Sequence, residues 1–298
     1  MWGESSGRPA AKCGPANLHP ALTIRLPLQQ VTLVAVDTQL PVLAAEALLR
    51  SMAQVDFARA VLFTHEWVPP RVIRGLEVVD IPPLPTPSDR SYFVLRQLPA
   101  HIRTSHALLV QWDGFVIHPE AWGPEFLTFD YIGAPWPGQP EGRNVGSGGF
   151  SLRSRHLLVA GQNPRWPEWH PDDQMLCLAH REELERDRGV HFAPSDIAQR
   201  FAAGAEMRRT PSFGFHGAHH LARVLDEATL GRWLGLLPDE FFLGAEARRL
   251  GRALLLQRRP ALLRQLLDRR KAAGEMDTES RLLGTATSIM GLLGPRTV

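Results

Sequence analysis

Two hydrophobic periods alternate over residues 29 to 115. Continuous apolar runs rich in β-branched residues predict strands buried on both faces, and apolar positions three or four residues apart predict helices between them. Ser88 or Asp89 is the expected N-cap of the second helix. The resulting order, strand, helix, strand, strand, helix, strand, predicts an α/β fold with a largely parallel sheet covered by helices. The expected strands cover residues 29–38, 59–65, 76–84 and 106–114, and the expected helices cover residues 41–55 and 88–102.

The pattern changes after residue 115. Residues 115–169 are rich in Gly, Pro and Trp and predict loops, which often build sites when a rigid sheet carries them. Helical periodicity returns near residue 170 and dominates the last part of the chain. This extension is expected to pack on the sheet or to offer a surface to a partner. We expect a flexible tail over residues 1–28, an α/β domain over 29–224 and a helical extension over 225–298.

The composition is that of an ordinary globular protein, with 44% hydrophobic and 21% charged residues in 298. A formal net charge of +2 gives no general attraction to nucleic acid, although the last third carries a basic face that suits a partner contact. Cys13 and Cys177 are too few for a disulfide framework, and no stretch approaches the roughly 18 apolar residues of a membrane span. The start of the chain also lacks the pattern of a signal peptide, so we predict a cytoplasmic protein.

Two acidic residues fall at expected strand ends. Ligands of open α/β sheets lie beyond the carboxyl ends of the strands, where Asp37 with Thr38, and Asp113 with Gly114, are predicted to stand. A carboxylate there can hold a hydrogen-bonding ligand edge or a divalent ion, and Gly114 would let a ligand approach the backbone. The simpler alternative is that Asp113 and Gly114 are a turn pair.

Three glycines between residues 146 and 149 precede an expected strand. A backbone of this kind can pass beneath a sugar or phosphate, which makes Gly148 and Gly149 candidate ligand contacts. They do not form a dinucleotide fingerprint, because that motif needs a helix after the glycines. A glycine bulge at the start of the strand is the alternative.

An acidic pair and a loop histidine each have both a structural and a chemical interpretation. Asp172 and Asp173 open a helix, where acids are favoured as caps, yet one of them can also face a cleft as a general base. His216 is a loop histidine that can be structural or can bind a metal together with an acid. His219 and His220 are expected on a helix surface.

Tyr131 and Trp136 supply aromatic rings within the loop region. They can stack on a sugar or a base, or they can belong to the core.

Several stretches occur together in an order that resembles a known family. The family consists of bacterial proteins long labelled as a domain of unknown function, and it is similar to GT-A glycosyltransferases. The resemblance covers roughly residues 31 to 217. It rests on "VQWDGFVIHPEAW", "DYIGAPWP", "VGSGGFSLRSR", the acidic pair before a helix, "FAPSDIAQRF" and "FGFHG".

The resemblance implies a GT-A-like, Rossmann-like sheet and a hexosyltransferase-like activity that uses a nucleotide-sugar donor, with UDP as the expected nucleotide. Asp113 then stands where the Asp-x-Asp metal and diphosphate motif ends, and His216 matches a late histidine that completes the coordination of Mn²⁺ or Mg²⁺. Gly148, Gly149 and Phe150 match the strand edge that lines the donor sugar and the acceptor. Asp172 and Asp173 match the acidic pair that supplies the base.

The sequence departs from that pattern at three places. Gln111 replaces the first acid of the Asp-x-Asp motif, the acidic pair is Asp-Asp where Glu-Asp is usual, and the loop holds Asn144 and Ser147 where Asn-Gly-Asn-Gly-Gly is more frequent. The acceptor stays open: a glycan, a lipid or a protein.

Other functions compete with a glycosyltransferase. A nucleotide-sugar-binding module without catalysis would share the site. A nucleotidyltransferase should carry a glycine-rich basic loop after the first strand, where the chain reads "DTQLPVLAAEA". A hydrolase using an Asp/His pair lacks the Gly-x-Ser-x-Gly elbow and the helical zinc spacing. A plain interaction role stays open for the helical extension.

Overall fold

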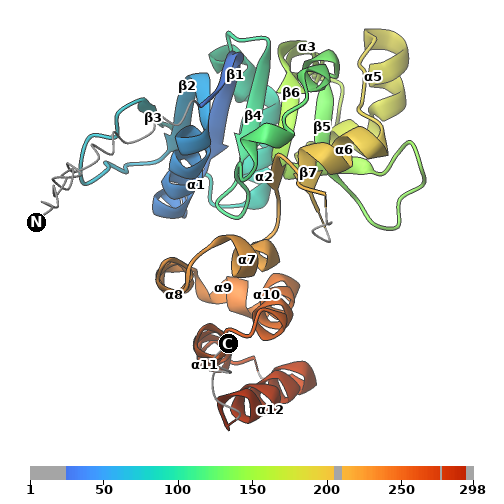
Figure 1. The fold of residues 1–298 in the computed structure, drawn as a ribbon. Helices are drawn as coiled ribbons and strands as arrows, with labels where there is room; N and C mark the ends of the chain where they lie inside the picture. Colours follow the sequence, from blue (N-terminus) through green and yellow to red (C-terminus); the bar gives the residue numbers. More distant parts are fainter. Residues whose placement is uncertain (1–24, 205–209, 276, 293–298) are drawn as a thin grey trace, which may run out of the picture.

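A mixed α/β unit with a six-stranded sheet forms the larger part of the molecule in the computed structural model, which describes residues 25–204, 210–275 and 277–292 (Figure 1). The strand order is β3-β2-β1-β4-β6-β5, and only β6 runs antiparallel to its neighbours. These strands are β1 (Leu26–Val36), β2 (Val55–Thr64), β3 (Leu76–Asp80), β4 (His106–Val110), β5 (Tyr131–Pro135) and β6 (Val145–Ser154). A small second sheet pairs β7 (Ala202–Ala203) with β8 (Gly214–Phe215).

Helices cover both faces of the sheet, and a stack of helices follows it. The first group comprises α1 (Pro41–Gln54), α2 (Pro87–Tyr92), α3 (Arg155–Ala160), α4 (Asp172–Gln174), α5 (Arg181–Arg188) and α6 (Ser195–Phe201). The second comprises α7 (Leu221–Val224), α8 (Glu227–Leu236), α9 (Asp239–Leu243), α10 (Ala245–Leu256), α11 (Pro260–Ala272) and α12 (Thr278–Leu292). Helical turns at Phe93–Gln97, Leu98–His101 and Met175–Ala179 extend α2 and α4, and short 3-10 turns lie at Pro119–Ala121, Pro124–Thr128 and Ala218–His220.

The expected α/β order is confirmed. The alternation of side chains along β1, a central strand of the sheet, explains why its hydrophobic pattern predicted it. Successive side chains of a strand point to opposite faces. Leu33 and Ala35 therefore pack against α1 and α6, whereas Val34 and Val36 pack against Phe93 and its neighbours after α2. Burial on both faces gives β1 its continuous apolar run.

Element boundaries differ from the expectation where local hydrogen bonds decide them. The strand β1 begins at Leu26, inside the expected tail, and residues 1–24 of that tail lie outside the described residues. The strand β4 ends at Val110 rather than at Gly114. Thr86 caps α2, because its hydroxyl accepts the Asp89 amide while the Asp89 carboxylate accepts the Thr86 amide in a reciprocal box.

The loop-rich middle region contains more regular structure than its composition predicts. Strands β5 and β6 form an antiparallel hairpin, and Gly146 to Gly149 lie inside β6 rather than before it. β4 pairs with β6 from Phe150 to Ser154, after the glycines. The glycine-rich stretch itself is held by pairing of Ser147 with Ala134 of β5 and by the Gln111 amide, which donates to the Gly149 carbonyl at 2.8 Å.

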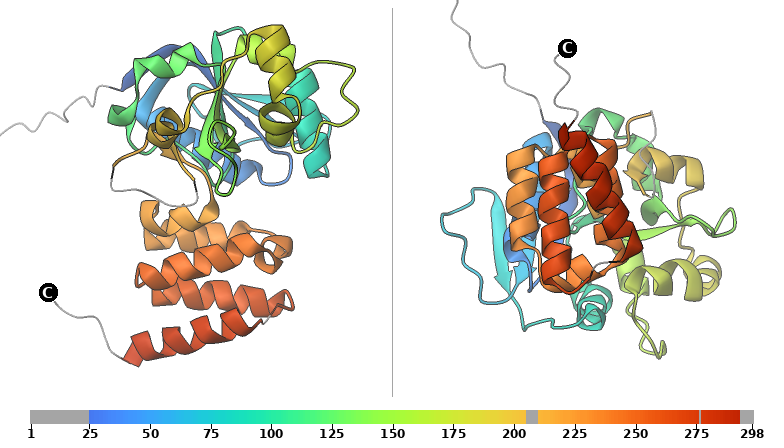
Figure 2. Two further views of the ribbon diagram at one scale, coloured as in Figure 1. Left: turned by 90° about the vertical axis from the view of Figure 1, so that its right-hand side faces the viewer. Right: turned by 90° about the horizontal axis from the view of Figure 1, so that it is seen from below.

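The C-terminal helices stack beyond one edge of the α/β unit (Figure 2). Trp233 of α8 is completely buried, its indole nitrogen donates to Glu46 of α1 at 2.8 Å, and Arg232 donates to the same carboxylate at 2.7 Å. The helices therefore pack against α1 and not on the sheet itself, where one of the two expected arrangements placed them, and a partner surface stays a prediction. Arg269 and Arg270 of the expected basic face donate to backbone carbonyls within the stack, so these two hold helices together.

None of the helices described in the structure is both long enough and apolar enough to cross a membrane.

The first prediction concerns the contact between α8 of the C-terminal helices and α1 of the α/β unit. Trp233→Ala should lower the free energy of unfolding by about 3–5 kcal/mol, because it removes a large buried ring and one of the hydrogen-bond donors to Glu46. Denaturant unfolding measures the change. Trp233→Phe is the matched control, which keeps most of the apolar volume and should cost clearly less. Equal stability of the alanine variant and the wild type would contradict the packing described.

Candidate functional site

A cavity of about 390 Å³ opens at the carboxyl ends of β1 and β4. These two strands are neighbours, but the chain leaves β1 toward β2 on one side and β4 lies on the other, so their ends form a topological switch point. Such crevices are where open α/β sheets bind ligands, and the volume suits a small organic ligand. The residues used below that line it are Asp37, Thr38, Arg90, Ser91, Gln111, Gly148, Gly149, His170, Asp172, Asp173 and His216.

Asp37 and Thr38 line the cavity as expected, and both also shape the loop that carries them. The Asp37 carboxylate accepts the amides of Gln39 at 2.9 Å and Leu40 at 2.7 Å. Burial raises the pKa of Asp37, and the backbone donors and Arg90 oppose that rise. The Thr38 hydroxyl accepts the Leu84 amide at 3.0 Å. Ligand binding by these two residues stays a prediction.

Asp113 and His216 meet at this site although they lie far apart in the sequence. The His216 Nε2 atom is 3.6 Å from the Asp113 carboxylate oxygen Oδ1. Asp113 stands in a turn, since the Gly114 amide donates to the Gln111 carbonyl at 3.0 Å, so the turn interpretation of Asp113 and Gly114 is also correct. Oδ1 of Asp113 is buried behind the cavity wall and accepts no hydrogen bond in the structure, so it is an acceptor without a donor.

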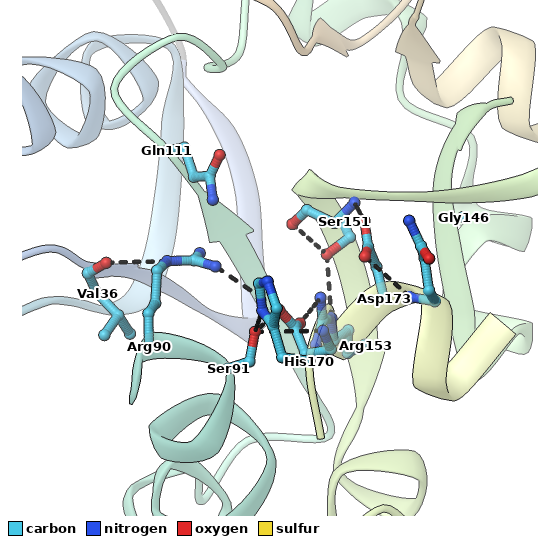
Figure 3. A network of polar contacts seen from close by, with 12 residues as sticks. Val36, Arg90, Ser91, Gln111, Gly146, Ser151, Arg153, His170 and Asp173 are labelled. Atoms are coloured by element: carbon cyan, nitrogen blue, oxygen red, sulfur yellow. Dashed lines mark hydrogen bonds and ion pairs between the residues drawn. The ribbon is translucent and has the colours of Figure 1, made fainter. Parts of the chain in front are cut away.

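Gln111 joins this pair to an arginine that sequence reasoning missed. With its amide oxygen toward Arg90, Gln111 accepts from both guanidinium nitrogens, at 3.1 and 3.0 Å, and its amide nitrogen donates to His216 at 3.3 Å. Arg90 also donates from Nε to the Val36 carbonyl at 3.2 Å (Figure 3). The Gln111 amide thus fixes the Arg90 guanidinium beside the cavity.

Two glycines make room for site side chains. A Cβ atom on Gly149 would overlap the His216 imidazole, and one on Gly148 would lie 2.9 Å from Cβ of Asp173. Real Cβ atoms do not approach other atoms this closely, so a larger residue at either position would displace His216 or Asp173. The structure therefore shows these glycines supporting protein side chains, and their contact with a ligand stays a prediction.

Asp172 is the buried member of the acidic pair. Its Oδ2 atom lies 2.8 Å from the Arg153 guanidinium, Arg90 is 3.7 Å away, and the Ser91 hydroxyl donates to Oδ1 at 3.2 Å. Burial alone would raise the pKa of Asp172, but the two guanidinium groups outweigh it and hold that pKa below its ordinary value. Asp172 is therefore a fixed negative charge.

Asp173 has the opposite character. Its carboxylate faces the cavity and accepts hydrogen bonds from the backbone amides of Gly148 at 2.9 Å and Gln174 at 2.8 Å. Burial and the nearby charge of Asp172 raise the pKa of Asp173. Two adjacent carboxyl groups whose environments move their pKa values apart are a common basis for assigning acid and base roles. Neither side chain caps α4 in the usual way, because Pro171 occupies the cap position.

His170 and Ser91 are further cavity residues that the sequence did not single out. The Ser91 hydroxyl lies 2.9 Å from His170 Nδ1 and also donates to Asp172 (Figure 3). Asp172 thus contacts the serine and has no recorded contact with the histidine, unlike the order of a Ser-His-Asp hydrolase, in which the acid orients the imidazole. Ser91 lies within a predicted helix, and nothing in the spacing of either residue indicates a site.

Several expected ligand contacts lie elsewhere. Tyr131 is fully buried and its hydroxyl donates to the Gly146 carbonyl, so it has no exposed ring face for stacking. Gly114 is closed off by the Phe215 carbonyl, 2.7 Å from where its Cβ would be.

His220 is buried rather than on the helix surface where it was expected, and burial, with His219 beside it, lowers its pKa to about 4.

A divalent cation fits part of this site. Among the described residues, no group of three or more His, Cys, Asp or Glu side chains is placed to hold a metal ion. Asp113 and His216 form a pair with an unpartnered carboxylate oxygen. Mg²⁺ commonly takes only one or two carboxylates and completes its shell with phosphate oxygens and water. The pair therefore suits a cation that arrives with a phosphorylated ligand.

Comparison with known proteins gives a family match over part of the chain. Residues 94–216 are similar to a family described as Protein of unknown function (DUF5672). This segment includes Asp113, Asp172, Asp173 and His216. No curated protein sequence matches the chain.

Among solved structures, the chain is similar to the mannosyltransferase PcManGT from Pyrobaculum calidifontis in complex with GDP-Man and Mn²⁺. The sequence identity is 12% and the TM-score is 0.38, with 88% of this chain and 80% of that chain covered. A likeness this remote carries no information about the ligand of this chain.

The second prediction separates the two adjacent carboxylates by stability. Asp172→Asn should lower the free energy of unfolding by about 3–5 kcal/mol, because it leaves the buried Arg153 without its counter-charge. Asp173→Asn should change it little, since an amide oxygen can still accept the Gly148 amide and the cost of a buried second charge disappears. Thermal and denaturant unfolding of both variants compare the two. A larger loss for Asp173→Asn would reverse the assignment.

Proposed function

We propose that this protein transfers a sugar from a nucleoside diphosphate sugar, with UDP as the expected nucleotide, to a hydroxyl group of an acceptor. One observation carries the proposal. A cavity at the sheet's switch point contains an aspartate of raised pKa, Asp173, beside a fixed anion, Asp172. The same cavity has a guanidinium, Arg90, and an imidazole, His216, on its walls. That combination supplies a base for the acceptor and positive or polar groups for a departing diphosphate.

The diphosphate is proposed to lie between Arg90 and the Asp113 and His216 pair. Arg90 is held by Gln111 and the Val36 carbonyl, so its guanidinium is oriented before a ligand binds. Preorganised donors aimed at developing charge are a main source of catalytic power. Mn²⁺ or Mg²⁺, when bound through Asp113 and His216, would add neutralising charge to the leaving group.

Asp173 is proposed to take the acceptor's proton. The acceptor oxygen forms a bond to the anomeric carbon while the bond from that carbon to the diphosphate oxygen breaks. The electron pair leaves with the diphosphate, and the hydroxyl proton passes to the Asp173 carboxylate. Attack opposite the leaving group inverts the anomeric configuration. A nucleotide-sugar-binding module without catalysis would bind the same donor and transfer nothing, which the measurements below distinguish.

The third prediction is that UDP binds at the switch-point cavity. Calorimetry should detect binding with and without Mn²⁺, and Arg90→Ala should weaken it by about 10- to 100-fold, the effect of losing a hydrogen bond to a charged group. Arg59→Ala is the matched control, because Arg59 pairs with Glu77 on the surface of β2 and β3. If no common nucleoside diphosphate binds under either condition, the proposed donor is wrong.

The fourth prediction concerns the base. Asp173→Asn should reduce sugar transfer by about 10²–10⁴-fold while UDP affinity stays close to that of the wild type. A base must be ionised, so the wild-type rate should rise with pH through a pKa above the ordinary aspartate value of 3.8, and the asparagine variant should lose this rise. Rates are measured with the nucleotide sugar that binds best. Wild-type rates in Asp173→Asn would exclude this residue as the base.

A further inference from the structure

A second cavity, of about 440 Å³, lies beside the β5–β6 hairpin. Trp136, Gln139 and Asn144 line it from the hairpin loop, and Ser195 and Gln199 line it from α6. None of these five side chains belongs to the proposed donor site.

The chemistry of this cavity differs sharply from that of the first. None of the described residues that line it is ionisable, whereas the first cavity holds three aspartates and an arginine. Side-chain amides and hydroxyls supply its polar groups. Such amides and hydroxyls favour a ligand that carries hydroxyl groups, because a buried polar group needs a hydrogen-bond partner.

Three polar side chains are arranged to exchange hydrogen bonds with a hydroxyl group. Asn144 Nδ2 and Gln199 Nε2 both donate to Ser195 Oγ, each at 3.3 Å. The serine oxygen thus accepts twice, which leaves its own proton to donate. The Asn144 amide oxygen is buried and accepts no hydrogen bond in the structure. Buried polar atoms are normally satisfied, so this oxygen is an acceptor that a ligand can complete.

Trp136 adds an aromatic wall to the same cavity. Its indole lies against Gly146, where any Cβ atom would overlap the ring, and the side chain is only partly buried. The backbone amide of Trp136 also donates to the Asn144 carbonyl at 2.6 Å, which ties the ring to the polar cluster. A rigid aromatic surface beside paired donors and acceptors is complementary to a sugar ring, which has apolar C–H faces and a rim of hydroxyl groups.

The two cavities share one wall. Asn144 precedes β6 and lines the second cavity, whereas Gly148 lines the first, about 13 Å further along an extended chain at roughly 3.3 Å per residue. His216 of the first cavity donates its amide to the carbonyl of Ala203 at 3.0 Å, and Ala203 lines the second cavity. A short saccharide is long enough to cover this separation.

We infer that the second cavity binds a hydroxyl-rich saccharide through Trp136, Asn144 and Ser195. Saccharide binding follows from this cavity alone. That the saccharide is the acceptor, or the part of an acceptor remote from the reacting hydroxyl, rests on the proposed function.

Saturation-transfer NMR with the neutral disaccharides maltose, lactose and cellobiose tests the inference. At least one should bind in the millimolar range. Trp136→Ala and Asn144→Ala should each reduce affinity by about tenfold or more, as expected for the loss of a well-placed polar or aromatic contact. Trp136→Phe, which keeps a ring, should retain more affinity and shows whether the alanine variant fails only through misfolding.

Trp67→Ala is the matched control, because Trp67 is a partly buried tryptophan in a different cavity at the β2–β3 connection. It should leave disaccharide binding unchanged. UDP added to the same samples should bind without displacing the disaccharide. Absence of binding by all three neutral disaccharides, displacement by UDP, or wild-type affinity in both Trp136→Ala and Asn144→Ala would each overturn the inference. Failure of UDP alone to bind would overturn the proposed donor and leave the saccharide site standing.

Discussion

A buried ion pair between β6 and α4 sets the geometry of the site. Arg153 and Asp172 are almost inaccessible, and their charged groups lie 2.8 Å apart. Separating such a pair would leave an uncompensated charge in the interior, at a cost of several kcal/mol, so α4 must stay against the strand. That constraint places Asp173, the next residue, over Gly148, where it accepts the strand's amide and faces the cavity. The structural charge and the candidate base are therefore neighbours for a physical reason.

Glycines in β6 complete the arrangement. Without side chains at Gly148 and Gly149, Asp173 and the His216 imidazole can both settle on the strand, and Gly146 does the same for Trp136 on the way to the second cavity. One stretch of a single strand thus receives an acid, an imidazole and an indole from three other segments. The chemistry proposed for the two cavities depends on this shared wall, because it separates a charged, phosphate-compatible cavity from one whose described polar groups are amides and hydroxyls.

Hydrophobic periodicity was sufficient for the first four strands of the sheet and insufficient for the site. It predicted the order from β1 to β4, because strands buried on both faces and helices buried on one have distinct periods. A strand was expected after Gly149, but β5 and the glycines inside β6 were missed, because glycines and prolines resemble a loop until pairing with neighbouring strands supplies the backbone partners. Asp113 and His216 were expected close together, and the structure places them in contact. Arg90, Ser91 and His170 were missed because the local sequence around each indicates only a secondary-structure element and no site.

The sequence by itself determined the α/β order, the strand end next to Asp37, and the adjacency of two acids at the start of a helix. These follow from local rules of spacing and side-chain type. Only the tertiary structure decided which acid is a fixed charge and which is a candidate base, that Tyr131 belongs to the core, and that the glycines support side chains. Burial and the nearest charged group control those properties. Both are set by residues that are distant in the sequence, such as Arg153 for Asp172, so no local pattern could contain them.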